Sequence, residues 1–174
     1  MMKLGPGPLR SGNNWEERGM SEIVQILISY ESDRICSIQF AYVQNGGVRH
    51  SKKYGQDGRV GFDANLSLLQ ESKVTFDYPS EYLTYVSGRY KDHDRLTSIV
   101  FGTNKRKYGP FGTSTSTEGE FNYKFGTRSS FAGFYGTVYC GLVYAIGVYV
   151  KPIQSLAELN NKPIESLAQV KTEK

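Results

Sequence analysis

The chain has 174 residues, of which 39% are hydrophobic and 13% aromatic, and it carries a formal net charge of +4. This length and apolar content suffice for one domain with a buried core, so a disordered chain is excluded. The basic residues are scattered apart from short runs at 52–53 and 104–107, whereas a nucleic-acid binder needs a clustered basic face, so we expect no nucleic-acid partner.

The same sequence indicates the compartment. Residues 1–10 lack the apolar run of a signal peptide, and no apolar run reaches the roughly 20 residues of a membrane span. Two distant cysteines, Cys36 and Cys140, fit neither a disulfide framework nor metal-ligand spacing. We therefore expect a cytoplasmic or nucleocytoplasmic protein with free thiols, no membrane partner, no metal and no cofactor.

Tyrosine, phenylalanine and glycine are abundant, which favours strands and tight turns over helices. The Asn45-Gly46-Gly47 segment is typical of a hairpin turn, because Asn and Gly both tolerate positive φ. Residues 54–65 are rich in Gly and polar residues and are predicted to be a loop. Such short, closely spaced strands favour a sandwich, barrel or prism. In chain order, the predicted strands form three blocks: 22–32, 34–43 and 48–54; then 72–78, 82–90 and 96–103; then 108–113, 119–125, 130–137 and 143–150.

The composition changes from Pro152 onward. The pieces 154–159 and 164–169 look like an imperfect repeat, and each is too short to form a stable isolated helix. We expect one domain over residues 1–152 and a flexible charged C-terminal tail over 153–174. The alternative is that this tail is a docking peptide for a protein partner.

Several segments occur in the order found in one known family. Residues 78–90 (Tyr-Pro-Ser-Glu-Tyr-Leu-Thr-Tyr-Val-Ser-Gly-Arg-Tyr), together with 108–113, 131–136 and 145–150, resemble the signatures of the jacalin-related lectins. The resemblance extends over roughly the first 152 residues.

The resemblance implies an all-β fold, the β-prism I, with three four-stranded Greek-key sheets around a pseudo-threefold axis. Each block of predicted strands could contribute one sheet, with the first and last strands completing one together. On the same resemblance, residues 3–6 form an opening strand and turn, and residues 12–19 form the first loop beside the sugar.

The resemblance also implies a sugar site. Backbone N–H groups of Gly12, Gly141 and Leu142 would donate to the sugar, and Tyr144 stands where the family has an aspartate. A carboxylate accepts two O–H bonds from vicinal hydroxyls, which a phenol cannot do.

Two substitutes for the missing carboxylate are conceivable. Asp92 or Asp94 in the 91–95 loop could accept the bonds, or Tyr139 and Tyr144 could stack on a sugar face. The plainer interpretation of Asp92 and Asp94 is a solvated turn, because Asp readily bonds its own backbone there.

Two functions follow from these expectations. The first is a carbohydrate-binding module for mannose- or glucose-type glycans with an altered site, used in plant stress or pathogen defence as the family implies. The second is a non-enzymatic protein-interaction module that has lost mannose binding, with partners reached through loops or the tail. Self-association into a homo-oligomer is also conceivable.

An enzyme is not expected. The sequence shows no Ser-His-Asp order and no phosphate-binding loop. Glu16 and Glu17 beside Trp15 could suggest glycosidase carboxylates. Adjacent residues in a loop point in different directions, which makes that pairing the weaker interpretation.

Overall fold

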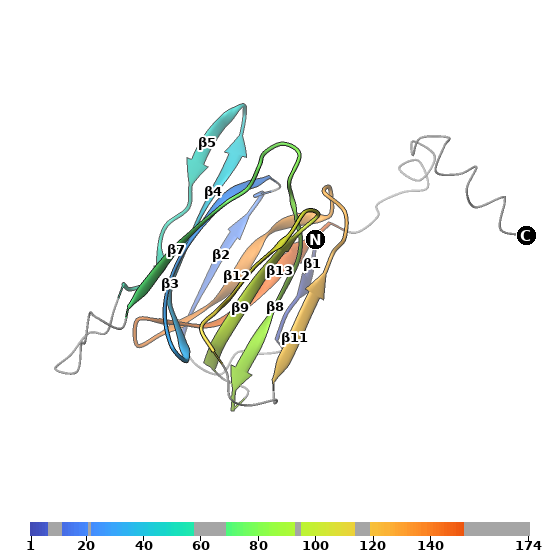
Figure 1. Cartoon of the computed structure of the whole chain (residues 1–174). Coiled ribbons are helices and arrows are strands. Elements are labelled where there is room, and N and C mark those ends of the chain that lie inside the picture. Colours follow the sequence, from blue (N-terminus) through green and yellow to red (C-terminus); the bar gives the residue numbers. More distant parts are fainter. Residues whose placement is uncertain (7–11, 21, 58–68, 93–94, 114–118, 152–174) are drawn as a thin grey trace, which may run out of the picture.

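The computed structural model describes residues 1–6, 12–20, 22–57, 69–92, 95–113 and 119–151. Every regular element in these ranges is a β-strand (Figure 1). The strands are β1 (Met2–Leu4), β2 (Asn13–Arg18), β3 (Ile23–Glu31), β4 (Arg34–Gln44), β5 (Gly47–His50), β6 (Tyr54–Gly55), β7 (Gln70–Thr75), β8 (Leu83–Lys91), β9 (Arg95–Thr103), β10 (Lys107–Phe111), β11 (Glu120–Lys124), β12 (Phe131–Tyr139) and β13 (Leu142–Val150).

The strands form three antiparallel sheets. The first has the order β1-β13-β12-β2, the second β5-β4-β3-β7 with β6 also paired to β4, and the third β10-β9-β8-β11. The expected all-β prism is therefore confirmed, and so is the completion of one sheet by the two ends of the chain, since Met2 pairs with Val150.

The assignment of one block to one sheet was wrong in two places. β7 belongs to the first block's sheet, because Val74 pairs with Ile26 of β3. β10 and β11 flank the middle hairpin, with Phe121 paired to Gly88 of β8. In a Greek key the fourth strand returns beside the first through a long connection, and the alternation within a strand does not encode which strand it pairs with.

Two segments predicted as loops contain strands. Residues 13–18 form β2, which pairs with β12 and buries Trp15 while Asn14 and Glu16 stay exposed. Tyr54–Gly55 forms the short strand β6 against β4. In β2 one fully buried residue among polar neighbours is too weak a pattern to indicate a strand, and β6 has only two residues, both half-buried. The predicted loop positions 58–65 and the predicted tail 153–174 lie outside the described residues.

The three sheets meet at an aromatic junction. Phe40 of β4, Phe101 of β9 and Phe134 of β12 are all fully buried. Phe40 and Phe134 stack with ring centroids 4.4 Å apart, and Phe101 meets Phe134 edge to face at 6.5 Å. Each sheet thus supplies one ring, and such rings bury the most apolar area per residue.

One buried hydroxyl offers a test of this packing. The Oγ1 atom of Thr137 on β12 is buried, and it has no hydrogen-bond partner among the residues that the structure describes. A buried polar atom without a partner is destabilising. We expect Thr137→Val to raise the free energy of unfolding by about 1 kcal/mol, measured by urea denaturation.

Thr97 of β9 is the matched control, because its buried Oγ1 donates to the Arg89 carbonyl at 3.1 Å. Thr97→Val removes that bond and is expected to lower stability by about 1 kcal/mol. Equal losses from both substitutions would show that the Thr137 hydroxyl is satisfied after all.

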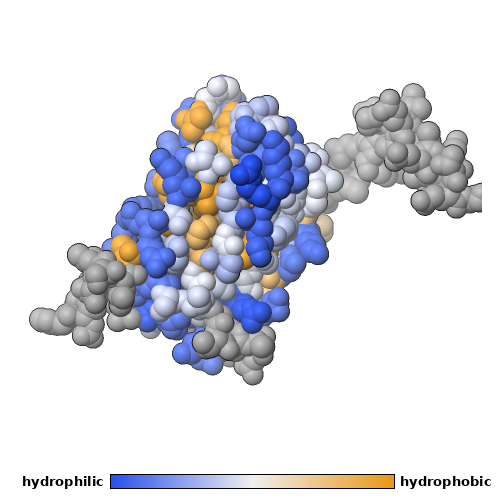
Figure 2. All heavy atoms as spheres, in the orientation of Figure 1, coloured by the Kyte–Doolittle hydropathy of each residue, from blue (hydrophilic) through white to orange (hydrophobic). Residues whose placement is uncertain are grey.

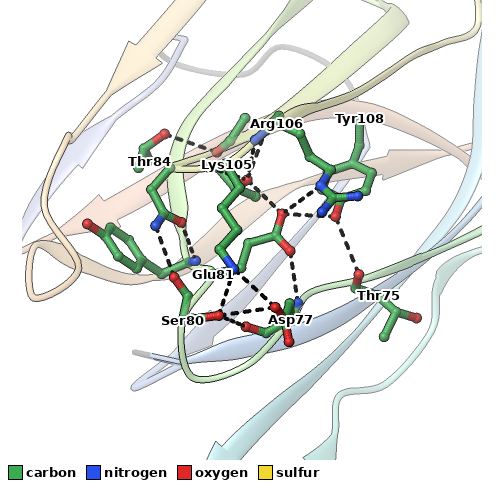
Figure 3. A network of polar contacts seen from close by, with 12 residues as sticks. Thr75, Asp77, Ser80, Glu81, Thr84, Lys105, Arg106 and Tyr108 are labelled. Carbon is green, nitrogen blue, oxygen red and sulfur yellow. Dashed lines mark hydrogen bonds and ion pairs between the residues drawn. The ribbon is translucent and has the colours of Figure 1, made fainter.

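A buried carboxylate fixes the segment before β8. Glu81 is 1% exposed, and Figure 3 shows its carboxylate pointing into a group of donors from two other segments. The Asp77 N–H donates to Oε2 at 2.8 Å, while the Thr103 and Tyr108 hydroxyls donate to Oε1 at 2.8 and 2.9 Å. Arg106 adds an ion pair at 3.6 Å. The network ties the 77–81 turn to β9 and β10.

Burial and the neighbouring hydrogen bonds and charge shift the pKa of Glu81 in opposite directions. Burial favours the neutral form of Glu81, but the hydrogen bonds from Asp77, Thr103 and Tyr108 and the Arg106 charge outweigh it, so the pKa of Glu81 lies below its usual range. The carboxylate is therefore ionised inside the fold at neutral pH.

The surface carries few large apolar side chains. Figure 2 shows hydrophilic residues over most of the visible face, with apolar ones in a narrow area along its middle. Five large hydrophobic residues are exposed among the described residues: Met1, Met2, Val48, Tyr78 and Tyr139. No helix among the described residues is long and apolar enough to span a bilayer.

Candidate functional site

Three hairpin turns lie at one end of the prism, the lower end in Figure 1: β3–β4, β8–β9 and β12–β13. Two of them are joined directly, because Arg95 at the start of β9 pairs with Asp33 of the β3–β4 turn at 3.3 Å. In addition, the Thr113 N–H donates to the Ser32 carbonyl at 2.5 Å. This end brings together the loops in which the sequence places its candidate residues.

The β12–β13 turn has a tight backbone. Cys140 and Gly141 both adopt left-handed conformations, with φ of 50° and 77°, as a two-residue hairpin requires. Gly12 lies against the same hairpin with φ of 96°, and a Cβ atom there would lie 2.4 Å from the Val138 carbonyl oxygen. Only glycine fits at position 12, so the backbone of the residue before β2 lies directly against the hairpin.

A third segment reaches the same turn. The Gln56 N–H donates to the Gly141 carbonyl at 2.8 Å and to the Cys36 carbonyl at 3.1 Å. Gln56 thus anchors the β12–β13 turn to β4. This contact could not be predicted from the sequence, because Gln56 lies in a segment predicted to be a loop and no local pattern signals it.

Tyr144 lies on β13 and is half-buried. Its ring meets that of Tyr139 at 5.1 Å in an edge-to-face arrangement, and Tyr139 is 46% exposed. Leu142 begins β13, where it pairs with Tyr139. The structure therefore brings Gly12, Gly141, Leu142 and Tyr144 to one hairpin, with a pair of tyrosine rings beside it.

Asp92 lies on a different hairpin. It is exposed and has a left-handed φ of 53° at the start of the β8–β9 turn. The ion pair between Arg95 and Asp33 joins this turn to the β3–β4 turn. Asp94 lies outside the described residues. Within the described ranges, no cluster of His, Cys, Asp and Glu could hold a metal ion.

Glu16 and Glu17 have separate partners. Glu16 accepts from the Tyr149 hydroxyl at 2.5 Å and from Arg18 at 3.1 Å, and the Tyr149 bond is the main reason that the pKa of Glu16 is lowered. Glu17 accepts from the Tyr54 hydroxyl. As neighbours on a strand they point to opposite faces of the sheet, so they do not form a facing pair of carboxylates.

The hairpin can contribute backbone N–H donors and aromatic faces. It lacks a carboxylate at position 144, the position at which the family resemblance implies the acceptor. A sugar hydroxyl needs an acceptor as well as donors.

Comparison with known proteins gives similarity of both sequence and fold. The family model of the Jacalin-like lectin domain matches residues 5–149. In Arabidopsis thaliana, Protein RESTRICTED TEV MOVEMENT 1 is 32% identical over 169 residues, covering 91% of this chain and 92% of that protein. Jacalin-related lectin 3 is 38% identical over 155 residues, covering 86% of this chain and 24% of that protein.

Myrosinase-binding protein 2, also from Arabidopsis thaliana, is 30% identical over 154 residues, covering 82% of this chain and 21% of that protein. Among solved structures, a mannose-binding lectin from champedak superposes with a TM-score of 0.70 at 28% identity, covering 87% of this chain and 96% of that one. Both the sequence and the fold thus match proteins of one kind over most of the chain.

Proposed function

The chain belongs to the jacalin-related lectin family, and from that premise we propose that it binds mannose- or glucose-type glycans through a site with an altered acceptor. The observation that supports the proposal is the close contact of Gly12 with Val138 and Tyr139 of β12, the strand that leads into the turn at Cys140 and Gly141. The champedak relative, by its description, is a mannose-binding lectin.

In this proposal the N–H groups of Gly12 and Gly141 donate to the sugar. Leu142 pairs with Tyr139 at the base of a two-residue turn, so its own N–H is the least available of the three. The Tyr139 and Tyr144 rings offer apolar faces for the sugar ring. Asp92 and Asp94 stay candidates for an accessory acceptor from the neighbouring hairpin.

The change at position 144 sets the expected strength of binding. A hydrogen bond to a charged group contributes about 1.5 to 3 kcal/mol, so the loss of even one costs about tenfold in affinity. We therefore propose weak binding of single sugars by the wild-type chain.

A glycan array and isothermal titration calorimetry with methyl α-mannoside test the proposal. We expect array signals for mannose-type glycans and a dissociation constant of about 1 mM or weaker, which corresponds to about −4 kcal/mol. Silence on the array together with no heat up to about 50 mM sugar would overturn the proposal.

That silent outcome would favour the second candidate, a non-enzymatic protein-interaction module. It is supported by Tyr144 in the acceptor position and by a relative named for binding myrosinase. The plant-defence setting is likewise a proposal, since one relative is named for restricted TEV movement. A cytoplasmic location is supported by the two free cysteines, buried Cys36 and exposed Cys140.

A further inference from the structure

A polar groove lies on the sheet formed by β5, β4, β3 and β7. Its volume is about 390 Å³, within the range of about 300–1,000 Å³ found for small-molecule sites. Ser29 of β3 and Ser37 of β4 line it, with Lys53 and Asp57 beside β6 and Glu71 and Lys73 on β7. These residues belong to none of the candidate positions at the β12–β13 hairpin.

Two serines form an organised polar floor. Ser29 and Ser37 are 2% and 3% exposed, and their hydroxyl oxygens lie 2.6 Å apart. Both hydroxyls also lie within hydrogen-bond distance of Oδ1 of Asp57, at 3.1 and 2.6 Å. Each serine has a single hydroxyl hydrogen but two acceptor lone pairs. The two serine oxygens can therefore still accept a hydrogen bond from a ligand in the groove.

The carboxylate above this floor is held in its charged form. Burial opposes the ionisation of Asp57, but the bonds from Lys53, Ser37 and Ser29 outweigh it, and the pKa of Asp57 is lowered. Lys53 pairs with the other carboxylate oxygen, Oδ2. The Asp57 carboxylate, fixed by three partners, is about one third exposed and can still accept a bond from a ligand.

The groove's charge selects the class of ligand. Lys53 and Asp57 on one side and Glu71 and Lys73 on the other carry two positive and two negative charges, so the part of the lining that the structure describes is neutral overall. A charged ligand gains little net attraction from such a lining. Hydroxyl groups, which both donate and accept, match serine oxygens, carboxylates and ammonium groups alike, and Leu27 supplies an apolar contact.

We propose that this groove is a second binding site, which takes a neutral polyhydroxylated ligand of disaccharide size. The inference rests on the proposed function only for the class of ligand. The groove lies beside the hairpin site, because Gln56 contacts Gly141 and the next residue, Asp57, lines the groove.

The test is a titration of the ¹⁵N-labelled protein with maltose, α-1,2-mannobiose and lactose, each followed by backbone amide shifts. We expect at least one sugar to shift the amides of Ser29, Ser37 and Lys73. We also expect Asp57→Asn to weaken that binding about tenfold. The matched control is Glu120→Gln, whose side chain is exposed on β11, and it should leave the affinity unchanged.

Binding at the two sites can be followed separately. The amides of Gly12 and Gly141 lie at the hairpin, and those of Ser29 and Ser37 lie in the groove. Shifts at the hairpin amides without shifts in the groove, for all three sugars, would overturn the groove site and leave the proposed function standing. Shifts in the groove alone would support the groove and count against the hairpin site. Unchanged affinity in a folded Asp57→Asn variant would also overturn the proposal.

Discussion

Replacing Tyr144 with aspartate is expected to raise the affinity of the chain for methyl α-mannoside at least tenfold. The substitution places a carboxylate beside the N–H donors of Gly12 and Gly141, where it can accept two charge-assisted bonds from vicinal hydroxyls. Each is worth about 1.5 to 3 kcal/mol, and about 1.4 kcal/mol corresponds to a factor of ten. Isothermal titration calorimetry of both proteins measures the difference.

Two further variants separate charge from shape. Tyr144→Asn supplies a polar side chain of the same size as aspartate without the charge, and it should gain less. Tyr144→Ala removes the contact with Tyr139 and should gain nothing. If Tyr144→Asp folds, as judged by its thermal transition, and still binds no more tightly than wild type, the hairpin does not present its donors to a sugar.

Replacing Glu81 with alanine is expected to lower the free energy of unfolding by about 3 kcal/mol. The change leaves the Asp77 N–H and the Tyr108 hydroxyl without their carboxylate partner, and the 77–81 turn loses its bonds to Thr103 of β9 and Tyr108 of β10 (Figure 3). The bonds from Lys105 to Asp77 and Ser80 remain. Urea denaturation at neutral pH measures the loss. Glu120→Ala is the matched control, because that carboxylate is exposed on the surface, and it should change stability by no more than about 0.5 kcal/mol.

The same carboxylate makes stability depend on pH. The pKa of Glu81 is lower in the fold than in the unfolded chain, so its contribution is complete above the unfolded value of about 4.3. The contribution is lost as the pH falls through the folded value. The difference in stability between wild type and Glu81→Gln should therefore shrink as the pH is lowered below about 4. A difference that stays constant with pH would mean that the charge of Glu81 does not contribute.

Local signals predicted most of the strands, except β1, β2 and β6, and some of the turns. Asn45 and Gly46 adopt φ of 51° and 78°, as expected of residues that tolerate this region. The β12–β13 turn differs, because Cys140 takes the same conformation without being a residue that favours it. Its position came from the family resemblance and not from turn chemistry.

Pairing between distant segments could not be predicted in the same way. β7 pairs with β3 across a connection of many residues, and Gln56 joins a turn far along the chain. The burial of Glu81 could not be predicted either, because glutamate is usually exposed. Its carboxylate is buried only because Asp77, Thr103 and Tyr108, which lie apart in the sequence, all donate hydrogen bonds to it in the fold. The Ser29–Ser37–Asp57 cluster likewise exists only after β3 and β4 have paired.

The pairing of Met2 with Val150 bears on how the protein folds during synthesis. The sheets built on β3–β4 and β8–β9 use contiguous stretches of chain, whereas β1 and β2 must wait for β12 and β13 to leave the ribosome. Until then Trp15, Phe40 and Phe101 lack Phe134 and the last hairpin as partners. Nascent chains that stop before β12 therefore expose apolar surface and unpaired strand edges, which makes them clients for chaperones.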